Sequence, residues 1–359
     1  MKVRIALLLI GASIVLAASA RTQNAPSTDL PSAPSSSQQT TQPSKPAAPP
    51  SQAATAEQQT QPAGAQPPGA QPPANTPPDD SVATIVKRVN EVNVVFTVTD
   101  RHGRYVKDLK RNDFKILDDG KPVLEIRSFR AETDLPLEAG LLIDASNSIR
   151  DRFKFEQEAA IEFLNDILRR NYDRAFVVGF DVTPEVTQDF TDDTEALSVG
   201  IRSLRPGGGT ALFDALYFAC RDKLLKASPN GAVRRVIILL SDGDDNQSHV
   251  TREEAIDMAE RAGVVVYTIS TNLMGGGKHG DKVLERIADA TGGRSYVPFQ
   301  LTEVANAFAA IQEELRSQYA ISYKPADFQP DGRYRTIEIT TKQKGLHVRS
   351  RRGYYAPTQ

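Results

Sequence analysis

The region from about residue 135 to residue 317 alternates between short apolar segments and segments with helical spacing, and this alternation most constrains the fold. Residues 236–240 are apolar throughout, and residues 140–144 are uncharged up to the final Asp144. Strands that are apolar on both faces and alternate with helices form mostly parallel sheets covered by helices on both sides. We therefore predict an α/β fold with an open, doubly wound, mostly parallel sheet.

The same apolar spacing predicts the bounds of the individual strands and helices. The predicted strands are residues 140–144, 175–180, 236–240, 264–269 and 295–298. The predicted helices are one that carries Phe155, Ala159, Phe163 and Ile167, then residues 193–204, 212–225, 251–262, 281–290 and 302–316. Cys220, the single cysteine, lies at helical spacing from Leu212, Leu216 and Leu224 and is predicted to be a core residue. One cysteine excludes an intrachain disulfide and a cysteine-based metal cluster.

Both flanks of this region have the period-two pattern of short antiparallel strands. The pattern runs from Val92 to Phe129, and it returns in residues 319–323, 333–341 and 346–350. Neither flank alone has enough strands for a stable sheet sandwich. We predict that residues 81–133 and 318–359 pair as one small β-sandwich-like module and that residues 134–317 are a domain inserted into it.

The first eighty residues are predicted to lie outside the fold. Residues 1–20 have a basic start, an apolar run and the ending Ala18-Ser19-Ala20, which is typical of a secretory signal peptide. The run is shorter than the roughly 20 residues that span a bilayer, although an uncleaved signal anchor remains the alternative. Residues 21–80 hold 14 of the 23 prolines and one large apolar residue, Leu30, so we predict a disordered linker. The chain is thus expected to be exported, as a periplasmic, cell-surface or secreted protein, without membrane insertion beyond the signal segment.

Charge argues against nucleic acid as a partner. The chain has 43 Lys and Arg residues against 45 Asp and Glu residues, and the two kinds are interspersed. Binding to phosphates needs a concentrated basic surface. The local group Arg349, Arg351 and Arg352 is interpreted as a solvated strand end.

Three polar segments follow predicted strands or a glycine loop. Asp144-Ala145-Ser146-Asn147-Ser148 follows the first strand, Gly207-Gly208-Gly209-Thr210 ends a loop, and Ser241-Asp242-Gly243 follows the strand 236–240. Open α/β sheets bind ligands in the crevice beyond the carboxyl ends of their strands. The donors on offer are carboxylates and hydroxyls, which suit Mg²⁺, Mn²⁺ or Ca²⁺ rather than zinc or copper. The candidate metal ligands are Asp144, Ser146, Ser148, Thr210 and Asp242.

These segments, with Ala211-Leu212 after the glycine loop and Leu239-Leu240 before Ser241, resemble the metal-ion-dependent adhesion site of the von Willebrand factor A domain family over roughly residues 136–317. The resemblance implies a Rossmann-like fold and cation-dependent binding of a protein ligand whose Asp or Glu completes the metal shell. Residues 109–120 and 351–357 resemble, more loosely, a group of exported bacterial proteins with such a domain. The implied cofactor is Mg²⁺, with Mn²⁺ or Ca²⁺ as alternatives, and the oligomeric state is open.

The sequence also bears on other functions and other sites. A metal-free protein-interaction scaffold of the same fold stays open, as does a metal-assisted hydrolase, although we expect no enzyme. The glycine loop lacks the Gly-Lys-Ser/Thr ending of a nucleotide-binding loop, and the serines lack a Gly-x-Ser-x-Gly elbow. Asp242 to Glu253 imitates a calcium-binding EF-hand loop at five positions, but Gln247 stands where that loop needs glycine. Asp151 is a candidate for a second cation or, alternatively, an ordinary acid in a first helical turn.

Overall fold

The computed structural model describes residues 91–131, 135–150, 152–227, 233–272 and 279–358. The predicted signal peptide, the predicted proline-rich linker and Asp151 lie outside these residues. None of the helices formed by the described residues is long and apolar enough to cross a membrane.

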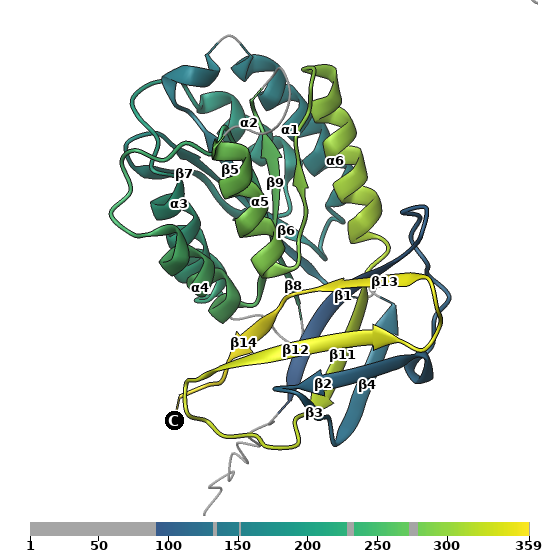
Figure 1. The fold of residues 1–359 in the computed structure, drawn as a ribbon. Coiled ribbons are helices and arrows are strands. Elements are labelled where there is room, and N and C mark those ends of the chain that lie inside the picture. Colours follow the sequence, from purple (N-terminus) through teal and green to yellow (C-terminus); the bar gives the residue numbers. More distant parts are fainter. Residues whose placement is uncertain (1–90, 132–134, 151, 228–232, 273–278, 359) are drawn as a thin grey trace, which may run out of the picture. The chain divides into compact units, whose positions relative to one another are not determined.

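A six-stranded sheet forms the centre of the fold, in the order β10-β9-β8-β5-β6-β7 (Figure 1). Five strands are parallel and only β7 is antiparallel, so the predicted doubly wound, mostly parallel sheet is confirmed. The strands are β5 (Leu137–Asp144), β6 (Arg174–Phe180), β7 (Pro184–Thr191), β8 (Arg234–Ser241), β9 (Val264–Ser270) and β10 (Ser295–Tyr296). All eight residues of β5 are buried, because helices cover both faces of this central strand.

Three helices pack on each face of the sheet. One apolar cluster joins it to α1 (Phe153–Ile167), α2 (Thr194–Ser203) and α6 (Thr302–Leu315). A second cluster, which includes the buried Cys220, joins the other face to α3 (Leu212–Phe218), α4 (Arg252–Ala262) and α5 (His279–Thr291). Local sequence fixes the ends of α4, where Thr251 and Glu254 form a capping box and Gly263 takes the left-handed conformation that glycine adopts without strain.

Two four-stranded sheets are built from the flanks, in the orders β13-β1-β11-β4 and β14-β12-β2-β3. The strands are β1 (Val92–Asp100), β2 (Phe114–Asp118), β3 (Lys121–Pro122), β4 (Glu125–Ala131), β11 (Tyr319–Lys324), β12 (Tyr334–Thr341), β13 (Leu346–Ser350) and β14 (Gly353–Tyr355). β1 pairs with β11 and β13, and β2 pairs with β12. Phe96, Phe114 and Tyr319 pack in one shared apolar cluster. The division of the chain into an inserted domain and a separate β-module stays a prediction.

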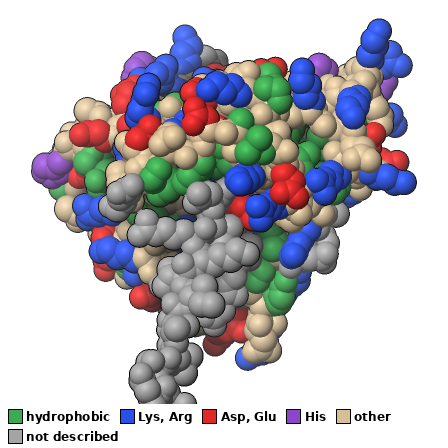
Figure 2. All heavy atoms as spheres, turned by 90° about the horizontal axis from the view of Figure 1, so that it is seen from below, with side chains coloured by type: hydrophobic (Ala, Val, Ile, Leu, Met, Phe, Trp, Pro, Cys, Tyr) green, Lys and Arg blue, Asp and Glu red, His purple; other side chains and the backbone are tan. Residues whose placement is uncertain are grey.

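Basic and acidic side chains are mixed over the outer surface. Seen from below in Figure 2, Lys and Arg side chains lie next to Asp and Glu side chains on the part that is not grey. This agrees with the near balance of 43 basic and 45 acidic residues.

Two features of residues 135–317 differ from the sequence prediction. Strand β7 was not predicted, because an edge strand buries only a few side chains, here mainly the partly buried Val186 and Phe190. The predicted helix 212–225 is not α-helical throughout, since residues 219–224 form a π-helical turn in which Leu225 N–H donates to the Cys220 carbonyl at 2.9 Å.

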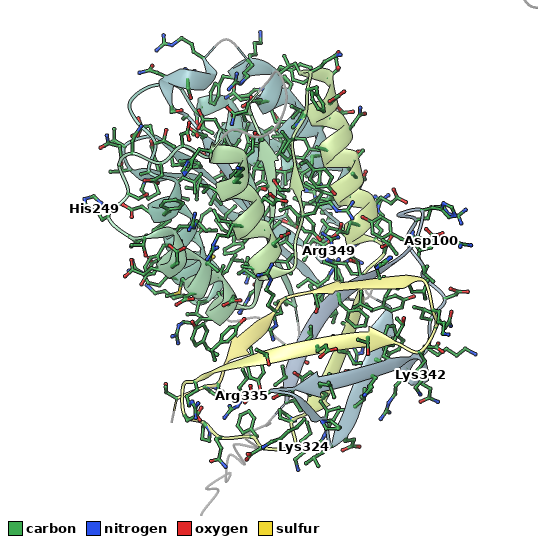
Figure 3. All side chains as sticks on the ribbon, viewed as in Figure 1. Asp100, His249, Lys324, Arg335, Lys342 and Arg349 are labelled. Carbon is green, nitrogen blue, oxygen red and sulfur yellow. The ribbon has the colours of Figure 1, made fainter. Side chains whose placement is uncertain are left out.

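A buried carboxylate joins α6 to the flanking strands. Glu314 is fully buried and accepts hydrogen bonds from the hydroxyls of Tyr267 (2.6 Å) and Tyr105 (2.9 Å), and it forms an ion pair with Arg349 of β13. Arg349 also donates to the Gly293 carbonyl at 2.7 Å. Figure 3 shows Arg349 where β13 meets the helical region. The network therefore fixes the end of α6 against strands contributed by both flanks.

Candidate metal site

Parallel pairing brings two of the polar segments to one edge of the central sheet. β5 and β8 are neighbours, with Ile143 opposite Leu240, so Asp144 and Ser241 leave the sheet side by side. The loop with Thr210 lies against the same edge, because Gly207 N–H donates to the Ala145 carbonyl at 2.6 Å.

A continuous set of hydrogen bonds links four of the five predicted ligands. Ser241 Oγ donates to Asp144 Oδ2 at 2.6 Å, and Ser146 N–H donates to Asp144 Oδ1 at 2.9 Å. Ser146 Oγ lies 2.9 Å from Ser148 Oγ, and Ser148 Oγ donates to Asp242 Oδ2 at 2.8 Å. Asp144, Ser146 and Asp242 are buried while Ser148 is exposed, so the set opens to solvent through Ser148.

Thr210 is placed by its backbone. Its N–H donates to Asn246 Oδ1 at 3.0 Å, and its carbonyl accepts from Asn246 N–H at 3.0 Å. Among the described residues, no hydrogen bond joins the Thr210 hydroxyl to the other four side chains. The structure therefore brings together Asp144, Ser146, Ser148 and Asp242, and it places Thr210 in the loop beside them.

Burial shapes the electrostatics of this edge. The pKa of Asp144 is raised to about 6, because burial and the Asp242 charge raise it by more than hydrogen bonds from Ser241 and Ser146 lower it. Beneath them lies Glu156 of α1, which is fully buried and has a pKa raised to about 8, mainly by desolvation. Among the described residues its carboxylate oxygens accept no hydrogen bond, and Oε1 forms an ion pair with Arg152 Nε at 3.3 Å. A cation at the strand ends would favour the ionised form of these acids.

Sequence reasoning missed Glu156, although a signal for it exists. Glu156 precedes Ala160 by four residues and Phe163 by seven, which is the spacing of one buried helix face. An acid on such a face is unusual and marks a polar site beneath it. Asp151 lies outside the described residues, so the second cation at that position stays a prediction.

A second polar cluster holds the Asp242 backbone. Asn272 Nδ2 donates to the Asp242 carbonyl at 2.8 Å and to Asp281 Oδ1 at 3.1 Å, and Ser270 Oγ donates to the same Asp281 oxygen at 2.6 Å. Next to Asp242, Gly243 has a φ of +81° and packs against Gly280, where a Cβ on Gly280 would lie 2.0 Å from the Asp242 carbonyl oxygen. Only glycine fits at this contact, so α5 determines where the Asp242 loop lies.

The donor set fits a hard divalent cation. It consists of two carboxylates and neighbouring hydroxyls, which are oxygen ligands of the kind that Mg²⁺, Mn²⁺ and Ca²⁺ take. In the part of the chain that the structure describes, no three His, Cys, Asp or Glu side chains cluster closely enough to hold a metal. Any ion at this edge would thus depend on hydroxyl ligands as well as on Asp144 and Asp242.

The side chains of the EF-hand-like loop and of His249 form hydrogen bonds that do not fit a calcium loop or a serine nucleophile. Asp245 accepts from Phe213 N–H at 3.1 Å and Ser248 Oγ accepts from Asp214 N–H at 2.9 Å, so these groups hold the loop against α3 rather than forming an EF-hand. His249 is 86% exposed and its Nδ1 lies 2.9 Å from Asp214 Oδ2. Figure 3 shows His249 at the outer edge of the domain. In this structure it forms no hydrogen bond with Ser146 or Ser148 that would suit a serine nucleophile.

Comparisons with known proteins agree with this fold. The family model of the von Willebrand factor type A domain matches residues 140–314. Calcium-activated chloride channel regulator 1 of Bos taurus is 30% identical over 178 residues, which are 48% of this chain and 18% of the relative. A UPF0353 protein of Mycolicibacterium paratuberculosis is 27% identical over 199 residues, which are 49% of this chain and 60% of the relative. The chain therefore spans less than two thirds of both relatives.

A solved structure of proximal thread matrix protein 1 from the mussel byssus, described as having a zinc-occupied MIDAS motif, is 18% identical with a TM-score of 0.44. The match covers 55% of this chain and 49% of that one. The family model and the mostly parallel central sheet agree, so residues 140–314 of this chain are a von Willebrand factor type A domain.

Proposed function

We propose that this chain is an exported adhesion-type module that binds a partner protein through one Mg²⁺ ion. The von Willebrand factor type A domain is a protein-interaction module, which supports a protein partner. The proposal of a metal ion is supported by the hydrogen-bonded side chains at the carboxyl ends of β5 and β8. This set runs from Ser241 through Asp144, Ser146 and Ser148 to Asp242. Mn²⁺ and Ca²⁺ are the alternatives to Mg²⁺.

In this proposal the ion is held by Ser146, Ser148 and Thr210 and, directly or through water, by Asp144 and Asp242. Bound there, Mg²⁺ supplies an electrophilic position for an external carboxylate. The carboxylates of Asp144 and Asp242 balance the charge of the cation. The exposed Ser148 marks the side from which a partner's Asp or Glu enters. The site lacks an aligned base and nucleophile in the described residues, which supports binding rather than catalysis.

A capture experiment tests this function. The chain is immobilised and exposed to the exported protein fraction in Mg²⁺, with chelator in a parallel sample. We expect a partner that is retained in Mg²⁺ and released by chelator, and that is lost when the partner's contacting Glu or Asp is replaced by the amide. Capture that is equal in both samples would instead support the metal-free scaffold. Ester or phosphate turnover that disappears in Asp242→Asn would support the hydrolase.

Gly280→Ala is expected to weaken Mg²⁺ binding without removing any ligand. The new Cβ would overlap the Asp242 carbonyl oxygen at 2.0 Å, so the Asp242 loop must move. Such overpacking lowers stability by about 1–3 kcal/mol. Melting curves over a Mg²⁺ series would show a higher half-saturating concentration than in wild type. Lys282→Ala, an exposed change on the same helix, should behave as wild type. An unchanged half-saturating concentration in Gly280→Ala would contradict the role of this contact.

A further inference from the structure

A cleft of about 820 Å³ lies at the opposite end of the central sheet from the metal site. Its walls come from the first residues of β8 and β9, the end of α4, the strands β1, β4 and β11, and residues 351–357 near the C-terminus. The volume is within the range of small-molecule sites, roughly 300–1,000 Å³. The cleft is thus large enough for a ligand and is formed jointly by the flanks and the von Willebrand factor type A domain.

Arginine is concentrated in the lining of this cleft. Two glutamates also line it, Glu91 and Glu260. The lining arginines are Arg127, Arg130, Arg234, Arg235, Arg261 and Arg351. The part of the surface that is not grey in Figure 2 mixes both signs of charge, whereas the described lining of the cleft has six arginines and two glutamates.

Arg351 lines the cleft without a carboxylate partner among the described residues. Its Nη2 donates to the Asn93 carbonyl at 2.8 Å, but its buried Nε has no hydrogen-bond partner among the described residues. It makes no ion pair with any carboxylate of the described residues. Burial lowers the pKa of Arg351, which reflects the cost of placing this charge away from water. A guanidinium whose Nε is buried and unbonded is stabilised when an anion joins it.

Glu260 also lines the cleft and its charge acts on Arg351, but the two form no ion pair among the described residues. Its carboxylate accepts a hydrogen bond from the Tyr334 hydroxyl at 3.1 Å, and desolvation raises its pKa to about 7. Glu260 is therefore only partly ionised near neutral pH, and it forms no ion pair with Arg351 among the described contacts. The positive charge beside it remains available to a ligand.

Two further arginines add to this unmatched charge. Arg261 lies over the Tyr355 ring, with its Cζ 3.8 Å from the ring centroid, and it forms no ion pair with a described residue. Arg130 is exposed at the rim and likewise has no ion pair with the described part of the chain. By contrast, Arg127 pairs with Glu91 at 3.3 Å and Arg235 approaches Glu138 at 3.5 Å.

We propose that this cleft binds the oxyanion group of a small organic ligand, a carboxylate or a phosphate, with Arg351 as its principal contact. A guanidinium presents parallel N–H donors that match both kinds of oxyanion. Ile321, Phe328 and Tyr354 also line the cleft and offer apolar surface to the rest of the ligand. The proposal does not depend on the metal site, which lies at the other end of β8.

Calorimetric titration of the full chain with benzoate and with inorganic phosphate, in chloride buffer free of divalent metal, tests the proposal. We expect saturable binding of at least one probe, and the stronger of the two identifies the carboxylate or the phosphate as the source. Arg351→Gln should lower the affinity about tenfold or more, as expected for loss of one charge-assisted contact. Arg351→Lys, which keeps the charge but not the fork of donors, should fall between that variant and wild type.

Arg202→Gln is the matched control, because Arg202 lies exposed on α2 and pairs with Glu158. It should bind the probes as wild type does. A readout that needs no substitution is the ¹⁵N resonance of Arg351 Nε, which should shift as the probe saturates. The proposal is overturned if neither probe binds saturably at millimolar concentration, or if binding occurs without a shift of that resonance.

Discussion

Replacing Asp144 with asparagine is expected to abolish the rise in melting temperature that Mg²⁺ gives the wild-type chain and to leave the metal-free fold intact. Asp144 is completely buried and contributes one of the two carboxylates of the proposed site. Asparagine has nearly the same shape, and its Oδ1 can still accept from Ser146 N–H while its amide donates to Ser241 Oγ. The substitution therefore removes charge without leaving a cavity.

The expected effect is large because a saturating ligand stabilises a protein by about 2.7 kcal/mol at a hundred times its dissociation constant. Melting of wild type and Asp144→Asn, each with Mg²⁺ and with chelator, measures it. Asp193→Asn is the control, since Asp193 caps α2 and asparagine caps helices equally well. If Asp144→Asn kept the full Mg²⁺ response, the metal would have to be bound elsewhere.

Replacing Glu314 with alanine is expected to lower the free energy of unfolding by about 3–5 kcal/mol. The carboxylate is fully buried between Tyr267, Tyr105 and Arg349, so its loss leaves two hydroxyls and a guanidinium that is only 25% exposed without this acceptor. An uncompensated buried charge is among the largest single-residue effects on stability. Urea unfolding followed by circular dichroism gives the value.

The neighbouring Glu313 provides the comparison. Glu313 is exposed, so Glu313→Ala should change stability by no more than about 0.5 kcal/mol. Glu314→Gln keeps the shape and one acceptor and should lie between the two. A loss below about 1 kcal/mol in Glu314→Ala would mean that the network does not hold α6 in solution.

The central sheet was predictable because its strands are buried on both faces, so the middle residues of its long strands are mostly apolar. The same reasoning failed for β7, where one-sided burial at the sheet edge leaves only Val186 and Phe190 as a signal. Position along the strands also predicted that Asp144 and Asp242 would lie together, since the carboxyl ends of neighbouring parallel strands share an edge. Their role as metal ligands stays a prediction.

Contacts between segments that are distant in the sequence could not be predicted. Glu314 lies on the buried stripe of α6 with Ile311, but its partners Tyr105 and Arg349 come from opposite flanks of the chain. The packing of Gly243 against Gly280 likewise depends on how α5 is placed. Helical spacing shows that such residues are buried, whereas only the fold shows what they touch.

The pairing of the flanking strands has a mechanical consequence. The von Willebrand factor type A domain connects to the rest of the chain through β4 and β11, which are antiparallel neighbours with Ala131 opposite Tyr319. Tension applied between residues 91 and 358 would first load the pairing of β1 with β11 and β13 and the pairing of β14 with β12. As long as β4 and β11 stay paired, the domain forms a closed loop outside the path of the force. A partner held at Asp144 and Asp242 would then be bound by a domain that keeps its shape while the chain around it is stretched.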